Sequence, residues 1–578
     1  MACVHINSFP DELLAAIFWP SKLLSSRLVD DDAVWASVLP SPRFLRENAD
    51  EPCYQQNDKV FPVPDLPPAF ADAAYNLLLA SICRRWRRLA QRHVSTLLVK
   101  KNCAVSCEDL DAAVECFPNL THLHLSDGSA RPIHNAFLAR LAASCPKLTA
   151  FHLENEIVQN QEYQQPGERF LTRAGFDFFF RQCTRLEHLS LGCLHSDFGL
   201  PGSIYQLVRL RSLALADLSA LTAPQVKAFS SLAALSINTL IWDYQDLQNL
   251  TQLASLTCLS VPREVFLSSR ATPPHPFSFA HLSSLRSLDL GYGCPQFDVM
   301  FPSDSPCSLL ERLSLNQCDD LANLPDDISN RLPSLRELSI SDCFMKHPKQ
   351  VTSLSCLRSL ILSGCSFVGL PDSLGEMPAL KTLVLDKLSL NFPASCSRLQ
   401  SLETLVVSEC TSCDELRGPL KFPTSLKTLC LAGSPFLVLP DNIGELINLE
   451  TLFLNMYRTR HQLPSSFVQL ASLTRLELQQ CELAELPEAM GELRRLRELY
   501  LFSCWRIQKL PESLSHLCKL QLSKSRIQSL PSNFVRLTRM QDLDLRDCKQ
   551  LEALPDDLGE LKLLGSLNTD GCDKLHGD

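Results

Sequence analysis

The sequence predicts an α/β solenoid of about 19 stacked rungs, each made of one short parallel strand and a return segment. Three observations support this prediction. A phrase with leucine at positions one, four and six, and often cysteine at position nine, recurs between Leu310 and Cys572 with a period of about 23 residues. A Leu-Pro-acid tripeptide, as in Leu370-Pro371-Asp372, recurs between these phrases. Looser copies of the phrase begin at Leu120 and extend the pattern toward the N-terminus.

Each phrase is expected to form a strand whose leucines point into the core, because successive side chains of a strand point to opposite faces. The residues between the leucines then share one concave surface. The phrase and its period resemble those of leucine-rich repeats, and this resemblance implies a horseshoe-shaped solenoid.

The ninth position is the place where leucine-rich repeats carry Asn or Cys, because backbone groups of the turning chain need a polar side chain there. We therefore predict a structural ladder of reduced, buried thiols rather than disulfides. Its members are Cys318, Cys343, Cys365, Cys410, Cys481, Cys504, Cys548 and Cys572.

The return segments are expected to form brief helical turns, because proline presets a helical φ and the acid that follows it suits a helix N-terminus. In the earlier part of the chain, helices are expected at 135–144 and 175–182, and the rungs there have longer periods. These earlier rungs resemble the cysteine-containing repeat class found in many F-box receptors. The predicted organisation is an N-terminal helical module at 1–97, irregular repeats at 98–284 and regular repeats at 285–578.

The N-terminal module carries two strings that resemble the opening and the close of an F-box, Phe9-Pro10-Asp11-Glu12-Leu13-Leu14 and Ile82-Cys83-Arg84-Arg85-Trp86. They are separated by an unusually long segment, of which 40–68 is rich in proline and is expected to be an inserted loop. The resemblance implies docking on the Skp-type adaptor of a cullin ubiquitin ligase. The implied adaptor-binding residues are Phe9, Pro10, Leu13, Leu14, Ile17, Phe18, Cys83 and Trp86. A solvated helix face and a nuclear-localisation signal are the alternatives for the arginine-rich string.

Composition and motifs limit the remaining possibilities. A formal net charge of −10 and a pI near 5.8 argue against broad nucleic-acid binding. No leader and no apolar run long enough for a membrane span is present, so we expect a cytoplasmic protein, with the nucleus as a second compartment. Nucleotide-binding and kinase signatures are absent, and we expect no enzyme activity and no cofactor. His124 and His152, with Glu154 nearby, are a weak candidate metal pair, and we expect no metal site.

The concave surface holds the candidate binding site. Residues between the second and third leucines form one column, whose middle is apolar and includes Phe453 and Tyr500. These side chains are expected to face solvent, where aromatic residues commonly act as binding anchors. Truncating Tyr500 should then weaken partner binding at least about thirtyfold with little change in stability. The predicted partner-binding residues are Phe453, Met456, Tyr457, Tyr500, Phe502 and Trp505.

Two functional classes are compatible with these observations. The first is an F-box substrate receptor, which would hold the adaptor with its N-terminal helices and an unknown protein substrate with its concave surface. The alternative is an intracellular leucine-rich-repeat scaffold or signalling protein, similar to plant Ras-group-related or immune-related proteins, with no role in ubiquitin ligation. Association with the Skp adaptor, lost on deletion of residues 1–97, would distinguish the two.

Overall fold

The computed structural model describes residues 95–99, 107–125, 133–153, 171–191, 200–217, 229–242, 250–267, 278–292, 296–318, 321, 323–367, 369–389, 394–410, 421–433, 439–455 and 463–575. The chain divides into two compact units. Unit 1 comprises Met1–Phe277 with His281–Leu285, and unit 2 comprises Ser278–Ala280 with Arg286–Asp578. Residues 1–94, with the F-box-like strings and the insertion at 40–68, lie outside the described residues.

In unit 1 the structure describes seven strands, which pair in parallel and in chain order. They are β1 Thr96–Val99, β2 His122–Leu125, β3 Ala150–Leu153, β4 His188–Leu191, β5 Ser212–Asp217, β6 Ala234–Trp242 and β7 Cys258–Leu267. The return segments contain α5 Cys107–Cys116, α6 Asn135–Ser144, α7 Arg173–Gln182 and η4 Gly202–Gln206. The helix predicted at 135–144 is confirmed, and the helix predicted at 175–182 begins two residues earlier because Thr172 caps it by accepting from the Gly175 N–H.

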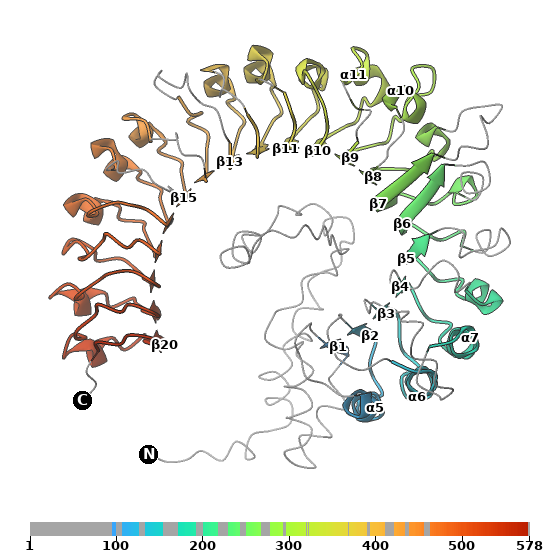
Figure 1. Ribbon diagram of the computed structural model, residues 1–578, viewed down its shortest axis with the longest axis horizontal. Helices are drawn as coiled ribbons and strands as arrows, with labels where there is room; N and C mark the ends of the chain where they lie inside the picture. The colour runs from blue at the N-terminus through green and yellow to red at the C-terminus, as the bar shows by residue number, and fades with distance from the viewer. Residues whose placement is uncertain are drawn as a thin grey trace, which may run out of the picture. The chain divides into compact units, whose positions relative to one another are not determined.

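The described residues of unit 2 form thirteen strands with the same parallel order. They are β8 Ser287–Tyr292, β9 Arg312–Asn316, β10 Glu337–Ser341, β11 Ser359–Ser363, β12 Thr382–Asp386, β13 Thr404–Ser408, β14 Thr428–Ala432, β15 Thr451–Asn455, β16 Arg475–Gln479, β17 Glu498–Phe502, β18 Lys519–Gln521, β19 Asp542–Asp544 and β20 Ser566–Asn568. Figure 1 shows that within this unit the strands line the inner side of the arc and the short helices lie on its outer side.

The described residues of the two units give twenty strands of an α/β leucine-rich-repeat solenoid, which confirms the predicted fold class. The additional rung is β1, which pairs with β2 from Thr96 to Val99. Its sequence lacks the spaced leucine phrase, so the repeat pattern did not indicate it. Hydrogen bonding to β2 places it in the sheet nevertheless.

The leucines of each phrase form the core of the solenoid. In the rung of β11, for example, Leu357, Leu360 and Leu362 are all buried, and the side chains between them alternate outward. Consecutive rungs pair without a register shift from β8 to β20. Equivalent positions therefore stand side by side in columns along the inner surface of unit 2.

The return segments of unit 2 are short helical turns, most of them 3-10 helices. They are α10 Phe297–Met300, α11 Ile328–Arg331, η7 Lys349–Ser353, η8 Asp372–Glu376, η9 Ala394–Arg398, η10 Ile443–Glu445, η11 Ser465–Gln469, η12 Glu488–Glu492, η13 Phe534–Arg536 and η14 Leu558–Glu560. The proline before several of them accepts the first hydrogen bond of the turn, as Pro371 O does from the Leu374 N–H (2.9 Å). None of the helices in the described residues is long and apolar enough to cross a membrane.

Most strands of unit 2 end in a tight backbone turn just before the ninth position of the phrase. Gln480 there has a φ of 50°, in the left-handed region, and its N–H donates to Phe502 O of the next rung (2.8 Å). Gly433 occupies the equivalent place with a φ of 59°. This turn redirects the chain and leaves carbonyl groups at the end of the strand that need a donor.

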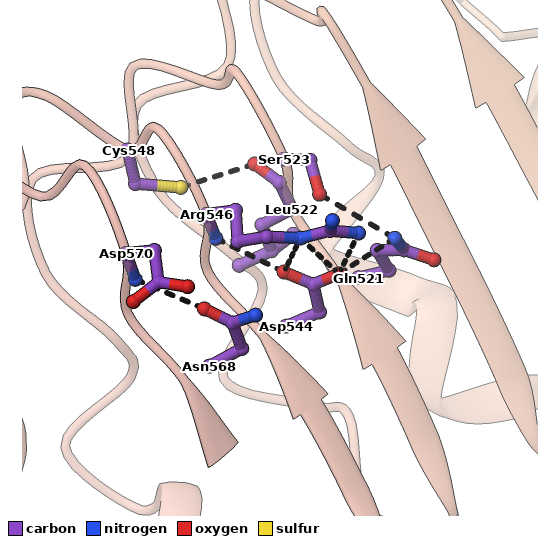
Figure 2. A network of polar contacts seen from close by, with 8 residues as sticks. All are labelled: Gln521, Leu522, Ser523, Asp544, Arg546, Cys548, Asn568 and Asp570. Atoms are coloured by element: carbon purple, nitrogen blue, oxygen red, sulfur yellow. Dashed lines mark hydrogen bonds and ion pairs between the residues drawn. The ribbon is translucent and has the colours of Figure 1, made fainter. Parts of the chain in front are cut away.

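The ninth-position thiols lie beside these carbonyl groups. The Cys504 Sγ donates to Leu478 O of the preceding rung (3.4 Å), and the Cys365 Sγ donates to Ile340 O (3.6 Å). Figure 2 includes Cys548 and Leu522, which form the same contact (3.0 Å). All the ladder cysteines bond to a carbonyl of the preceding rung in this way: Cys318, Cys343, Cys365, Cys410, Cys481, Cys504, Cys548 and Cys572. Within the described residues these eight are free thiols.

We expect replacement of Cys504 by asparagine to be tolerated and replacement by leucine to cost about 2 kcal/mol of unfolding free energy. Asparagine can still donate to Leu478 O, whereas leucine leaves that buried carbonyl without its donor. A hydrogen bond with Cys481 and burial both raise the pKa of the Cys504 thiol, so it acts as a neutral donor. Urea unfolding of the three proteins measures the difference, and equal midpoints for the two variants would contradict this role.

Candidate protein-binding surface

Strands β11 to β15 present a nearly uncharged inner surface. Its central column is the apolar band Ile361, Val384, Val406, Cys430 and Phe453, which stand in register on consecutive strands. One flanking column consists of hydroxyl residues: Ser359, Thr382, Thr404, Thr428 and Thr451. The other flanking column holds Ser363, Asp386, Ser408, Ala432 and Asn455. Of these fifteen positions only Asp386 carries a charge.

Asp386 is held in place by its neighbours on both sides. The Ser363 hydroxyl donates to its Oδ2 (2.9 Å), and the Ser408 hydroxyl donates to its Oδ1 (2.5 Å). Both serines stand next to it in register on adjacent strands. The carboxylate is therefore fixed on the inner surface as a single negative group beside the apolar band.

The apolar band is packed more closely toward β15 than toward β11. Cys430, Ala432 and Phe453 form a buried cluster against which Val406 packs, and Phe453 is 7% exposed. Ile361 and Val384 at the other end remain partly exposed. The exposed apolar contact area thus lies mainly over β11 to β13.

A charged network follows directly on β16 and β17. Glu477 stands in the central column between Phe453 and Tyr500. It accepts from Arg475 Nη2 (3.0 Å) and from Gln479 Nε2 (2.9 Å). Because Glu477 is only 7% exposed, its charge depends on these two partners for compensation.

Tyr500 belongs to the same network. Its hydroxyl donates to Glu498 Oε2 (3.1 Å), its ring lies 4.5 Å from the Arg475 guanidinium carbon, and it stacks on Phe502 at 6.0 Å. Burial and the nearby charge of Glu498 raise the pKa of Tyr500 to about 12, so its hydroxyl stays protonated and remains a donor.

The expectation that Phe453 and Tyr500 face solvent is wrong, since each is only 7% exposed. Both point to the inner surface, but neighbours on adjacent strands cover them, including Cys430 and Arg475. Truncating Tyr500 would therefore remove packing as well as any contact with a partner, and the expected small effect on stability no longer holds.

Two of the other predicted partner-binding residues are accessible to solvent. Phe502 is partly exposed next to Tyr500, and Trp505 is 40% exposed at the edge beyond the strand end. Met456 and Tyr457 lie outside the described residues, as do the predicted adaptor-binding residues. The latter are Phe9, Pro10, Leu13, Leu14, Ile17, Phe18, Cys83 and Trp86.

Strands β18 to β20 continue the inner surface with polar groups, which Figure 2 shows. Asp544 accepts from Gln521 Nε2 (2.7 Å) and from Arg546 Nη2 (2.7 Å). Burial raises the pKa of Asp544, but the hydrogen bonds from Arg546 outweigh this and hold it below its usual value. The inner surface of unit 2 thus passes from an apolar stretch to a network of paired charges.

The inner surface of unit 1 is different, because histidines gather on β2 to β4. The rings of His124 and His152 stack at 4.1 Å with 9° between their planes. Burial lowers the pKa of both His122 on β2 and His188 on β4. Within the described residues no group of three possible metal ligands is present, and Glu154 lies outside them.

The sequence did not indicate that Glu477 is buried or that Asp386 is fixed by two serines. Both could have been suspected from the register alone, since each is a carboxylate placed among outward columns of uncharged or oppositely charged residues. Burial depends on how closely neighbouring strands bring their side chains together, which the repeat phrase does not specify.

No family model matches the chain. Among curated proteins it is similar to the disease resistance protein RPS4B of Arabidopsis thaliana, with 32% identity over 30% of this chain and 14% of that protein. It is also similar to the TMV resistance protein N of Nicotiana glutinosa, with 31% identity over 32% of this chain and 19% of that protein. Among solved structures, a leucine-rich-repeat protein of Leptospira interrogans matches with 19% identity over 67% of this chain and 93% of that one, at a TM-score of 0.41.

The chain is a leucine-rich-repeat protein. Its relationship to the plant disease resistance proteins is distant and partial, because it spans only 14% to 23% of the length of the first curated relatives it matches. Those matches cover 30% to 42% of this leucine-rich-repeat protein. They relate it to the immune-related class of repeat proteins and add no support for the F-box resemblance.

Proposed function

We propose that this leucine-rich-repeat protein is a non-enzymatic recognition protein that binds another protein on the inner surface of β11 to β17. The observation that carries the proposal is the apolar band with partly exposed Ile361 and Val384, bordered on one side by hydroxyl groups and at its end by the Glu477 network. A partly apolar centre with a polar border is typical of protein interfaces. The similarity to plant disease resistance proteins supports a role in immune-type signalling, and we place the protein in the cytoplasm or nucleus.

The partner is expected to contribute a mainly uncharged segment to this surface. Across β11 to β15 the columns offer apolar carbon, hydroxyl groups and the single carboxylate of Asp386. A cationic side chain in that segment could pair with Asp386, whereas acidic side chains would face a carboxylate and gain little. No metal ion or cofactor is part of this proposal.

Replacement of Val384 by lysine should weaken partner binding at least about tenfold, because a cation would have to be desolvated in the exposed part of the apolar band when the partner covers it. Stability should change by less than about 1 kcal/mol, since Val384 is only partly buried and lysine can extend its amine to solvent. Gln400→Lys, at an exposed position just after η9, adds the same charge on the outer side and serves as the control.

The experiment is affinity capture of partners from plant tissue with the wild-type chain and both variants, followed by titration of each recovered protein against the purified chains. A partner retained by Gln400→Lys and lost by Val384→Lys supports the inner surface as the binding site. Partners that bind all three proteins equally would show that recognition takes place elsewhere.

A second candidate function is that of an F-box substrate receptor, and the two N-terminal strings that resemble an F-box favour it. In this case residues Leu13 and Trp86 would contact the Skp-type adaptor, while the inner surface would hold the protein to be ubiquitinated. The comparisons favour the first proposal, since they relate the repeats to disease resistance proteins. Co-purification of a Skp-type adaptor with the full chain, lost on deletion of residues 1–97, would establish this second function, and the absence of an adaptor would exclude it.

A further inference from the structure

A row of large cationic and aromatic side chains follows the ladder position on three consecutive rungs of unit 2. Trp505 comes directly after Cys504, Arg526 after Ser525, and Lys549 after Cys548. The side chains of Ser525 and Cys548 at the ladder position lie 3.4 Å apart, so the second and third of these three rungs stand in register. Since neighbouring rungs stand about 4.8 Å apart, Trp505, Arg526 and Lys549 form one edge row beside the strand ends.

Two guanidinium groups lie against Trp505. The guanidinium carbon of Arg506 is 5.1 Å from the ring, and that of Arg526, from the next rung, is 5.7 Å from it. Both distances are in the range of cation–π contacts. Such contacts orient a guanidinium group while leaving N–H donors available for a carboxylate. Trp505 is 40% exposed, so a ligand can reach both the ring and the cations beside it.

The positive charge of the edge row is only partly compensated within the protein. Neither Arg526 nor Lys549 forms an ion pair with a described residue, and both are exposed. Arg506 has only a long contact with Glu482, at 4.0 Å.

Behind the row, Arg546 is paired with Asp544, as Figure 2 shows, but remains 49% exposed. The neighbouring Asp547 is exposed and forms no ion pair with another described residue. The row therefore has one carboxylate close to it that is not already engaged by a cation.

The surrounding sequence is basic in an otherwise acidic chain. From Arg494 to Lys549 there are twelve Lys and Arg against five Asp and Glu, whereas the whole chain has a formal net charge of −10. This local excess gives the rungs of β17 to β19 a positive potential that attracts anionic groups.

We propose that the edge row of Trp505, Arg526 and Lys549 binds an acidic peptide segment of a partner protein. The segment would lie across the rungs, with its carboxylates near Arg526 and Lys549 and an apolar or aliphatic group against Trp505. This site is separate from the apolar band, whose columns are uncharged apart from Asp386 and favour a different segment. A partner could use both sites, but the edge row does not depend on the inner surface.

Nucleic acid is a poorer fit to the same row. Glu482 and Asp544 contact Arg506 and Arg546, and Asp547 is exposed two residues before Lys549, so a continuous phosphate backbone would approach these carboxylates. The net negative charge of the chain also opposes a long polyanion. A short acidic peptide can place its few carboxylates opposite the cations alone.

The test is fluorescence anisotropy of a fluorescein-labelled oligoglutamate peptide titrated with the full chain, with an oligoglutamine peptide and an oligothymidine strand for comparison. Arg526→Glu should weaken oligoglutamate binding at least about tenfold, because it reverses the central charge of the row. Arg536→Glu makes the same substitution at an exposed position of η13 in the same rung, and it should change binding less than about twofold.

Trp505→Ala should weaken binding about threefold or more, and Trp505→Phe should retain most of it because the ring is kept. Val384→Lys should leave oligoglutamate binding unchanged, so the proposed binding sites on the edge row and on the inner surface can be tested separately. Equal losses with Arg526→Glu and Arg536→Glu would overturn the proposal, since binding would then follow overall charge. Tighter binding of oligothymidine than of oligoglutamate, or no oligoglutamate binding by the wild-type chain, would overturn it as well.

Discussion

Replacing Arg475 by methionine should lower the free energy of unfolding by about 3 kcal/mol, because it leaves the carboxylate of Glu477 buried with Gln479 as its remaining partner. Glu477 is 7% exposed and cannot recover its hydration without moving out of the column. Methionine retains much of the aliphatic contact of arginine, but it also removes the ion pair with Glu498 (3.3 Å) and the contact with the Tyr500 ring. A second variant is therefore needed to isolate the effect of the buried charge. Urea unfolding followed by far-UV circular dichroism measures the effect.

The double variant Arg475→Met, Glu477→Leu is the control. If the buried charge is the cause, removing the carboxylate as well should restore most of the lost stability, because an apolar pair can replace a buried ion pair at little cost. The pair also lies at the border of the proposed binding surface. A loss below about 1 kcal/mol for Arg475→Met would mean that water screens Glu477, as it does for surface ion pairs.

The fold could be predicted because one phrase fixes both the strand and the direction of its side chains. Once the leucines of a rung are assigned to the core, positions such as Phe453, Glu477 and Tyr500 fall in one column, and the register of β15 to β17 agrees with this. Rung β1 was not predicted, because Thr96–Val99 does not contain the leucine phrase.

Burial on the inner surface could not be predicted in the same way. Alternation assigns Tyr500 to that surface, but Arg475 and Glu498 have long, flexible side chains whose contacts depend on the distance between strands. Trp505 and Arg526 belong to different repeats, 21 positions apart in the sequence. Their contact arises from the stacking of neighbouring rungs and could not be predicted from either repeat alone. The repeat phrase therefore assigns Phe453 and Tyr500 to the inner surface but does not predict that they are buried there.

Three glycines in the outer turns of unit 2 lie very close to the next rung. Gly375, Gly444 and Gly491 occupy the same place in their helical turns, and a Cβ there would lie 2.1, 2.4 and 2.5 Å from a serine carbonyl oxygen of the next rung. The serines are Ser395, Ser466 and Ser513. In two of these pairs the glycine N–H also donates to the serine hydroxyl, at 3.3 Å for Gly444 and 3.0 Å for Gly491.

Gly375→Ala should therefore lower the free energy of unfolding by about 3 kcal/mol, since its methyl group would meet the backbone of Ser395, and backbone yields less easily than a side chain. Gly559 supplies the matched control. It occupies the equivalent place in η14, the last helical turn among the described residues, so no following turn faces it and nothing lies within 4 Å of an added Cβ. Gly559→Ala should leave stability unchanged or raise it by about 0.5 kcal/mol, because alanine restricts the unfolded chain.

Val468 and Val535 hold the same place in turns where the next rung carries Ala489 and Asp557 instead of serine. Thr352 also holds this place although the next rung carries Ser373, whose hydroxyl donates to the Thr352 hydroxyl (3.1 Å). The close approach therefore belongs to particular pairs of rungs, and it does not reflect a general need for glycine in the turn. Urea unfolding of Gly375→Ala and Gly559→Ala decides between the two explanations. Equal losses would point to the conformation of the turn itself, whereas a loss confined to Gly375→Ala would show that the outer turns of neighbouring rungs are in contact through their backbones.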